Sequence, residues 1–377
     1  MKNSELEFKL KEVLPKFSAQ FQQKMLHSIE LLRKAERLAK SYDKENGYFL
    51  AFSGGKDSQC LYHIAKLAGV QFQAHMNLTS VYPPEVIRFV REQYPDVELA
   101  KPHDSIFNVA IRRKILPTMR VRWCCEEYKE MAGAGKVTLI GIRKAESVRR
   151  AKRNEVEINN HSFSGTLDEL EDYRKKKTAK AKQRKAQKNG GGVTIVNADG
   201  ERVLGCIRGK ESLLISPIIE WTDKEVWLFL NTLGIAHCEL YDQGYHRIGC
   251  ILCPMSSPKQ KAKEMMRWPH VKRNWIKAIK AIRAGGGGIS KRIYLVEHQT
   301  RPHSVRQSQR IAQETNRTRN QPKEATHGFS DSSSPDSLTE EQQNEIAENI
   351  FDWWVSGKSY KQWYADKFIQ LHINFND

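Results

Sequence analysis

The 377-residue chain lacks any long apolar run. No stretch approaches the roughly 20 consecutive apolar residues that a membrane-spanning helix needs. The first residues, MKNSELEFKLKEVLPKF, lack the hydrophobic segment of a secretory signal. We therefore expect a cytoplasmic protein with no membrane partner. In that reducing compartment, the seven cysteines are expected to be thiols or metal ligands rather than structural disulfides.

Two further absences exclude particular kinds of binding site. The chain contains no G-x-x-x-x-G-K-[ST] motif, which excludes one common phosphate-binding loop. Its twelve histidines are scattered, so no histidine-rich metal site is visible. Acidic residues are outnumbered, since 62 Lys and Arg face 44 Asp and Glu, and the net charge is +18. Such a balance suits a polyanionic partner, either a nucleotide or nucleic acid.

The stretch YFLAFSGGKDS at 48–58 carries the strongest chemical signal. Its apolar first half predicts a buried strand, and the segment 59–67 has helical spacing. Two glycines between them let backbone N–H groups approach an anion, while a lysine adds positive charge. An aspartate among phosphates makes sense when a divalent cation lies between them. The predicted phosphate-binding residues are Ser53, Gly54, Gly55, Lys56, Asp57 and Ser58.

Further apolar runs alternate with helical patterns along the chain. Strands are expected at 48–52, 72–78, 97–99, 137–142 and 213–219. This alternation predicts an α/β fold with a doubly wound, mainly parallel sheet and helical additions at both termini. Ligands bind such sheets beyond the carboxyl ends of the strands. The turns after the first and fourth predicted strands both fall at that edge.

We expect four parts along the chain. A helical segment at 1–46 contains an apolar stripe between residues 18 and 42, and the nucleotide-binding domain follows at 47–275. A polar linker at 284–337 is expected to be disordered, and a helical segment at 338–377 is expected to pack on the domain or on a partner.

A basic insertion at 165–192 interrupts the domain pattern. It includes EDYRKKKTAKAKQRKAQKNGGG, which has helical propensity and no core-facing stripe. One interpretation is a solvated charged excursion. The alternative is an arm that binds nucleic acid phosphates, which would make binding salt-sensitive.

A second basic turn follows the fourth predicted strand, in the sequence GIRKAESVRR at 141–150. Arginine forks suit bidentate contacts with phosphate or sulfate. We therefore add Gly141, Arg143 and Arg149 to the predicted nucleotide-binding residues, with Arg143 beside Lys56 and Asp57 as the residues that carry the chemistry. Further on, PIIEWTDKEVW at 217–227 contains a helix start with Thr222 as the N-cap.

Five motifs in order carry a family resemblance: SGGKDS, PPE, GIRKAESVRR, PIIEWTDKEVW and YDQGYHRIGCILCP. Over 47–275 the chain resembles the phosphoadenosine phosphosulfate reductase family in its broad sense. The resemblance implies the adenine nucleotide α-hydrolase-like fold and an adenine nucleotide or sulfonucleotide ligand. SGGKDS is similar to the loop of the N-type ATP pyrophosphatases, which split ATP between its α and β phosphates.

The cysteines form two pairs, CC at 124–125 and C-x-x-C at 250–253. Four thiolates in such pairs suit a tetrahedral zinc or iron–sulfur site. The resemblance to cluster-containing sulfonucleotide reductases favours a [4Fe–4S] cluster over zinc, with Cys124, Cys125, Cys250 and Cys253 as ligands. Cys238 is a candidate spare ligand or sulfur carrier, and Cys60 is expected to be a buried small hydrophobe.

Three functions remain open at this point. The first is an ATP pyrophosphatase that uses ATP with Mg²⁺ to adenylylate an acceptor for sulfur transfer, with a sulfur-donor protein as a partner. The second is a sulfonucleotide reductase that makes sulfite, although no cysteine follows Cys253 to serve as the usual tail nucleophile. The third is a non-catalytic, nucleotide-dependent module that binds nucleic acid. The intact SGGKDS loop favours the first.

Overall fold

The computed structural model describes residues 10–130, 132–183, 192–196, 202–208, 211–285, 339–358 and 362–363. The chain divides into two compact units: the first comprises Met1–His103 and Cys124–Cys250, and the second comprises Asp104–Trp123 and Ile251–Asp377. The domain limits expected from the sequence stay predictions. None of the described helices is both long and apolar enough to cross a membrane.

A seven-stranded sheet forms the centre of the first unit, in the order β3-β2-β1-β4-β9-β5-β6. The five strands from β3 to β9 are parallel to their neighbours, whereas β5 and β6 add an antiparallel edge. The sheet confirms the predicted α/β class. The strands are β1 Tyr48–Ala51, β2 Phe72–Asn77, β3 Glu98–Ala100, β4 Val137–Leu139, β5 Val156–Ile158, β6 Ser164–Gly165 and β9 Leu213–Ile215.

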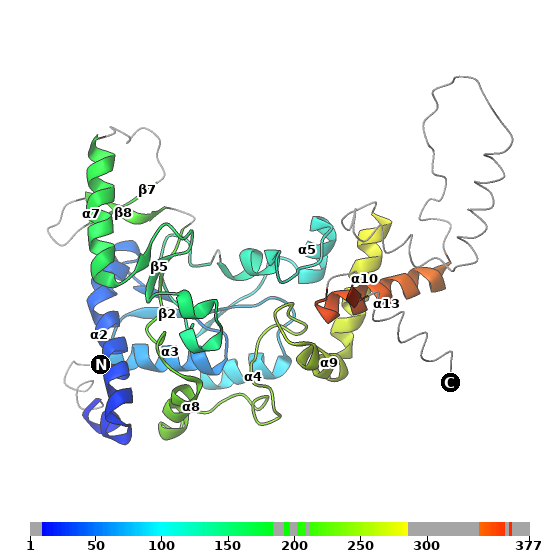
Figure 1. The fold of residues 1–377 in the computed structure, drawn as a ribbon, viewed down its shortest axis with the longest axis horizontal. Coiled ribbons are helices and arrows are strands. Elements are labelled where there is room, and N and C mark those ends of the chain that lie inside the picture. The colour runs from blue at the N-terminus through cyan, green and yellow to red at the C-terminus, as the bar shows by residue number, and fades with distance from the viewer. Residues whose placement is uncertain are drawn as a thin grey trace. The chain divides into compact units, whose positions relative to one another are not determined.

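Helices surround this sheet in the first unit (Figure 1). The longer ones are α2 Ala19–Tyr42, α3 Lys56–Ala68, α4 Pro84–Gln93, α7 Leu167–Gln183 and α8 Asp223–Thr232. Short helical turns occur at η1 Leu14–Lys16, α6 Trp123–Cys125, η2 Glu126–Glu130, η3 Lys144–Glu146 and η4 Arg150–Lys152. The α2 helix packs on α3, and α3 packs on α8.

The leading helix α2 follows its sequence pattern closely. Ser18 is the N-cap, and its side chain accepts a hydrogen bond from the Phe21 N–H. Most of the predicted apolar stripe is at most 2% exposed: Phe21, Met25, Ile29, Leu32 and Ala35. Helix α3 differs slightly from its prediction, because it begins at Lys56 rather than near residue 59. The polar start of α3 therefore lies directly at the end of the glycine turn.

The basic insertion holds α7, in which Lys175 and Lys176 are exposed. A two-stranded antiparallel hairpin follows, formed by β7 Gly192–Val196 and β8 Arg202–Arg208. The sequence did not predict this hairpin, nor β5 and β6. The strands β5 and β6 have only three and two residues, and only pairing with a neighbour makes such a segment a strand.

In the second unit, four helices pack together: α5 Ile106–Arg113, α9 Pro258–Arg267, α10 Pro269–Ala284 and α13 Glu340–Ser356. Helix α13 begins with a capping box between Thr339 and Gln342. Trp353 is only half-buried, whereas the buried residues of the helix are Ala347, Ile350, Phe351, Trp354 and Val355. The predicted linker lies outside the described residues, apart from residues 284 and 285.

Candidate nucleotide-binding site

Three adjacent parallel strands, β1, β4 and β9, direct their following loops to one edge of the sheet. These loops lead to Lys56 at the start of α3, to Lys144 at the start of η3 and to Asp223 at the start of α8. The strand order reverses between β1 and β4, because β2 and β3 lie on one side of β1 and β4 and β9 on the other. Ligand sites of open parallel sheets form at such a reversal.

The glycine turn after β1 needs its first glycine. Gly54 has a φ of +72°, and a Cβ there would lie 2.8 Å from Val86 Cγ1 and 2.9 Å from Val90 Cγ2 of α4. Only glycine fits both the left-handed backbone and the close packing. Gly55 has an ordinary φ of −84° and is the N-cap of α3.

Ser58 stabilises the turn from inside. Its hydroxyl donates to the Gly55 carbonyl (2.8 Å) and accepts from the Ser53 N–H (3.2 Å). Ser58 is 5% exposed. Its side chain therefore already has partners in the loop, and the predicted contact with phosphate stays a prediction.

The turn after β4 touches the phosphate loop directly. A Cβ on Gly141 would lie 2.9 Å from the backbone oxygen of Asp57 and 3.3 Å from the backbone nitrogen of Ser58. Residue 141 must therefore be glycine for β4 to approach the first turn of α3 this closely. The approach brings Arg143, two residues further on, to the carboxylate of Asp57.

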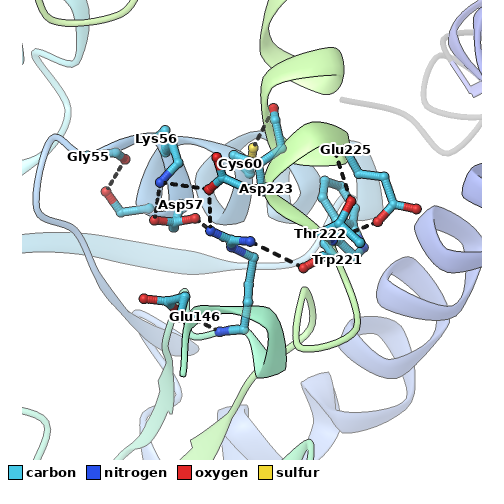
Figure 2. A network of polar contacts seen from close by, with 12 residues as sticks. Gly55, Lys56, Asp57, Cys60, Glu146, Trp221, Thr222, Asp223 and Glu225 are labelled. Carbon is cyan, nitrogen blue, oxygen red and sulfur yellow. Dashed lines mark hydrogen bonds and ion pairs between the residues drawn. The ribbon is translucent and has the colours of Figure 1, made fainter. Parts of the chain in front are cut away.

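Four charged side chains from the three loops form a closed network of ion pairs, part of which Figure 2 shows. Arg143 Nε donates to Asp57 Oδ1 (2.6 Å), and Arg143 Nη2 donates to Asp223 Oδ1 (2.9 Å). Lys56 Nζ lies 3.4 Å from Asp57 Oδ2 and 3.2 Å from Asp223 Oδ1. Arg143 Nη1 also donates to the Trp221 carbonyl (3.3 Å). We call Lys56, Asp57, Arg143 and Asp223 the charge quartet.

The quartet is more buried on its cationic side. The side chains of Arg143 and Lys56 are 2% and 8% exposed, whereas those of Asp57 and Asp223 are 23% and 62% exposed. Partial burial raises the pKa of Asp223, but Lys56 and Arg143 outweigh it and hold that pKa below its usual value. Burial lowers the pKa of Arg143, and Asp57 more than restores it. Asp223 and Arg143 are thus charged near neutral pH.

Tyr241 contacts the same loop from the YDQGY segment. Its hydroxyl accepts a hydrogen bond from the Lys56 backbone N–H (2.9 Å). The ring packs edge-on against Trp227 of α8, with 4.9 Å between the ring centroids. Burial raises the pKa of Tyr241, so the hydroxyl keeps its proton. The first N–H of α3, which would meet a phosphate oxygen, is thus directed at a side-chain oxygen here.

The structure brings together most of the predicted nucleotide-binding residues, because the glycine turn, Gly141 and Arg143 meet at the start of α3. Arg149 is exposed, and within the described ranges it makes no contact with the charge quartet. Sequence reasoning missed Asp223 and Tyr241. Asp223 follows the N-cap Thr222 and its position is explained by an ordinary helix start, while Tyr241 stands in a motif that carries only the family resemblance.

The predicted metal ligands are distributed over both units. Cys124, Cys125 and Cys250 belong to the first unit and Cys253 to the second. In the first unit, the charge of Lys129 interacts with both Cys125 and Cys250, which are far apart in the sequence. Thr79 Oγ1 lies 3.1 Å from Cys250 Sγ. Within the described ranges, no group of three or more His, Cys, Asp or Glu side chains is placed to hold a metal ion.

Two further cysteines are core residues. Cys60 and Cys238 are both 0% exposed. Burial raises the pKa of each thiol. The expectation that Cys60 is a buried small hydrophobe is confirmed.

The sheet and its three loops define an α/β protein with a candidate nucleotide-binding site at the strand carboxyl ends. A family model described as the phosphoadenosine phosphosulfate reductase domain matches residues 47–256, more than half of the chain. The chain belongs to this family, within the adenine nucleotide α-hydrolase-like superfamily. The family resemblance expected from the five motifs is confirmed.

Individual proteins that are similar to this chain share a low sequence identity with it or match only a small part of it. An uncharacterized protein of Methanocaldococcus jannaschii is 23% identical over 286 residues, which cover 73% of this chain and 58% of the relative. Adenosine 5'-phosphosulfate reductase 2 of Bacillus subtilis is 34% identical over 58 residues, 15% of this chain and 25% of the relative. The chain spans about half the length of the first curated relatives it matches, 58% and 48%.

Among solved structures, FMN adenylyltransferase of Candida glabrata in complex with FAD and pyrophosphate matches with a TM-score of 0.38 and 13% identity. The match covers 66% of this chain and 70% of that one.

Proposed function

We propose that the chain is an ATP pyrophosphatase that adenylylates an acceptor and so prepares it for sulfur transfer. The observation that supports this function best is the geometry at the start of α3. There an intact SGGKDS turn, the Lys56 ammonium and the Arg143–Asp57 pair meet at one edge of the sheet. Backbone N–H groups at a helix start, together with fixed cations, stabilise the charge that develops when a phosphate bond breaks.

In the proposed reaction, an acceptor oxygen attacks the α-phosphorus of ATP and forms a new P–O bond. The bond from the α-phosphorus to the bridging oxygen breaks, and pyrophosphate leaves with the electron pair. The acceptor proton passes to water. A sulfide-level sulfur nucleophile supplied by a donor protein then attacks the activated atom of the acceptor and forms a bond to it, while the bond from that atom to the AMP oxygen breaks and AMP leaves with the electron pair.

Lys56 is the group that neutralises the leaving pyrophosphate in this scheme. Its ammonium lies at the start of α3, whereas its backbone N–H donates to the Tyr241 hydroxyl. Removing a single such donor costs about 3 kcal/mol of transition-state stabilisation in other enzymes, or roughly a hundredfold in rate. Arg143 has partners on Nε, Nη1 and Nη2. We therefore assign it the role of a positioning residue that holds Asp57, rather than the predicted bidentate contact with phosphate or sulfate.

Mg²⁺ fits this set of side chains. It is usually held by one or two carboxylates together with phosphate oxygens, rather than by an all-protein cage. Asp57 and Asp223 supply two carboxylates beside Lys56. When bound, the ion would neutralise phosphate charge. Asp57 is the predicted ligand, and the Arg143 Nε–H orients its carboxylate.

The cysteine site remains part of the proposal. The thiols of Cys125 and Cys250 share Lys129 as a neighbour, which supports the expectation that the two cysteine pairs come together. Soft thiolate ligands select iron–sulfur clusters or zinc. We propose a [4Fe–4S] cluster on Cys124, Cys125, Cys250 and Cys253, with zinc as the alternative. Anaerobic purification followed by iron, sulfide and zinc analysis tests this, and a folded protein free of all three contradicts it.

The acceptor is proposed to be nucleic acid, because the net charge is +18 and the segment 174–188 carries only basic charges. Contacts between lysines and phosphates make affinity fall steeply with salt. Binding of single-stranded and double-stranded nucleic acid between about 50 and 200 mM salt measures the slope. A chain in which the lysines and arginines of 174–188 are replaced by glutamine should show a shallower slope.

The pyrophosphatase is tested with radiolabelled ATP, Mg²⁺ and a panel of nucleic acid and small-molecule acceptors. The full chain should release pyrophosphate, and Asp57→Asn should slow the release about a hundredfold. A matched control is Asp242→Asn, which removes one carboxylate from the YDQGY segment and should leave the rate unchanged. No release with any acceptor, or an equal rate in Asp57→Asn, contradicts the proposal.

A sulfonucleotide reductase is the second candidate. It is favoured by the similarity to adenosine 5'-phosphosulfate reductase 2 of Bacillus subtilis, although that similarity covers 15% of the chain. The buried Cys238 thiol has a raised pKa and is a poor nucleophile. A reductase would therefore depend on an external thiol. Sulfite production from adenosine phosphosulfate in the presence of a dithiol would favour this candidate.

A further inference from the structure

Asp223 contacts both cations of the charge quartet from outside the phosphate loop (Figure 2). Its Oδ1 atom is shared, because Lys56 Nζ lies 3.2 Å away and Arg143 Nη2 lies 2.9 Å away. The side chain is 62% exposed, whereas the two cations beneath it are almost completely buried. A ligand that approaches these cations from solvent therefore meets a carboxylate in the same place.

The charges of the quartet cancel. Lys56 and Arg143 contribute two positive charges, while Asp57 and Asp223 contribute two negative ones. The quartet therefore offers no net attraction to a bare polyanion, although the whole chain is basic. A metal-free phosphate group must compete with Asp223 for Lys56. A phosphate group neutralised by a divalent cation meets less repulsion, because the carboxylates then face the cation.

We propose that Asp223 is a specificity-determining residue that makes this site favour a nucleotide carrying a divalent cation over a metal-free nucleotide or sulfonucleotide. The inference rests on the proposed function and sharpens it, because it states which form of ligand the site selects. ATP with Mg²⁺ belongs to the favoured class. Adenosine phosphosulfate without a metal belongs to the disfavoured class.

The test is calorimetric titration of the full chain with three ligands: ATP with Mg²⁺, ATP with a chelator, and adenosine phosphosulfate with a chelator. The wild type should bind ATP with Mg²⁺ at least about fivefold more tightly than either metal-free ligand. Asp223→Asn keeps the shape and one acceptor oxygen but removes the charge. It should tighten both metal-free ligands about fivefold and leave ATP with Mg²⁺ within about twofold.

Glu220→Gln is the matched control. It removes the same charge three residues earlier, where the carboxylate pairs with Lys144 rather than with the quartet. All three affinities should stay at the wild-type values. Asp223→Glu keeps the charge and should keep the wild-type preference. The thermal unfolding midpoint of each variant shows whether it is folded.

The outcomes are distinguishable. Equal wild-type affinity for ATP with and without Mg²⁺ overturns the inference without any variant. Binding of ATP with Mg²⁺ combined with an unchanged preference in Asp223→Asn, or a uniform loss of affinity for all three ligands, overturns the inference and leaves the proposed function standing. No affinity of the wild type for any of the three ligands overturns both.

Discussion

Two regions of this protein, the loop edge of the sheet in the first unit and the helix cluster of the second unit, are each stabilised internally by different interactions. In the first unit, four charged side chains fix three loops at the sheet edge, and two of these side chains are appreciably exposed. In the second unit, aromatic rings join the helices: Trp275 of α10 packs on Trp354 of α13, with 4.9 Å between centroids. The buried Trp354 also donates from Nε1 to the Pro117 carbonyl (2.6 Å).

The two kinds of interaction therefore serve different ends: one orients the side chains of the site, and the other stabilises the fold. Charged pairs pay a desolvation cost that offsets most of their attraction, so the charge quartet contributes mainly orientation. Buried aromatic rings contribute a large free energy of folding but impose little directional constraint on a ligand. We therefore expect substitutions of the buried aromatic residues to change stability most, and substitutions in the quartet to change the site more than the fold.

Trp354→Ala should have the largest effect on stability. The side chain is 7% exposed and loses both its ring contacts and its hydrogen bond to Pro117. We expect the free energy of unfolding of the second unit to fall by about 3–5 kcal/mol. Hydrogen exchange of α10 and α13 measures this. Trp353→Ala, on the half-buried side of the same helix, should cost less than about 1 kcal/mol, and equal costs would contradict the assigned packing face.

Gly54→Ala should have the second-largest effect on stability, because it changes the backbone of the turn that precedes Lys56 and Asp57 of the quartet. The left-handed φ of +72° and the contacts at 2.8 and 2.9 Å with Val86 and Val90 both oppose a Cβ. We expect the free energy of unfolding of the first unit to fall by about 2–4 kcal/mol. Urea unfolding measures this change. At Gly55 the nearest atom to a new Cβ is 3.4 Å away, so Gly55→Ala should cost less than about 1 kcal/mol. A reversed order would show that the turn has another conformation.

Arg143→Lys should have a smaller effect on stability and a clear effect on the site. Lysine keeps the charge but cannot reach Asp57, Asp223 and the Trp221 carbonyl together. Loss of one or two hydrogen bonds should lower the free energy of unfolding by about 1–2 kcal/mol. Affinity for ATP with Mg²⁺, measured by calorimetry, should fall as well. Arg149→Lys, at an exposed position, should leave the unfolding free energy within about 0.5 kcal/mol of the wild-type value.

Glu264 should produce the smallest effect, visible as a pH dependence. Its carboxylate is buried in the second unit, where it accepts from the Leu252 N–H (2.6 Å) and from Gln260 Nε2 (2.8 Å). Burial raises the pKa of Glu264 above its ordinary value and outweighs these hydrogen bonds. A raised folded-state pKa gives stability that is present below the unfolded pKa and is lost as pH rises through the folded pKa.

The corresponding variant is Glu264→Gln, which does not titrate. The free energy of unfolding of the wild type minus that of the variant should fall as pH rises from about 4 to about 7, because only the wild type acquires a buried negative charge. Urea unfolding across this range measures it. Glu348→Gln, at an exposed position of α13, should show no such trend. A difference that grows with pH would mean that the folded state lowers the pKa of Glu264.

Local patterns predicted the parts of the site but not all of its contacts. Local sequence patterns predict the strand, the two glycines and the lysine of the phosphate loop, because each depends on neighbours within about ten residues. No local pattern predicts that Asp223 belongs to the site, because its role depends on Lys56 and Arg143, which are 167 and 80 residues away in the sequence. Tyr241 was missed for the same reason, since its partner is the Lys56 N–H.

The sequence by itself determined the parallel α/β class, the apolar stripe of α2 and the glycine turn after β1, because hydrophobic spacing and glycine's backbone freedom act locally. Only the tertiary structure decided that Gly141 touches the backbone of Asp57, that Arg143 is occupied inside the protein, and that Asp223 covers Lys56. These contacts arise where loops from three neighbouring strands converge. Strand order is set by long-range packing, which no local pattern specifies.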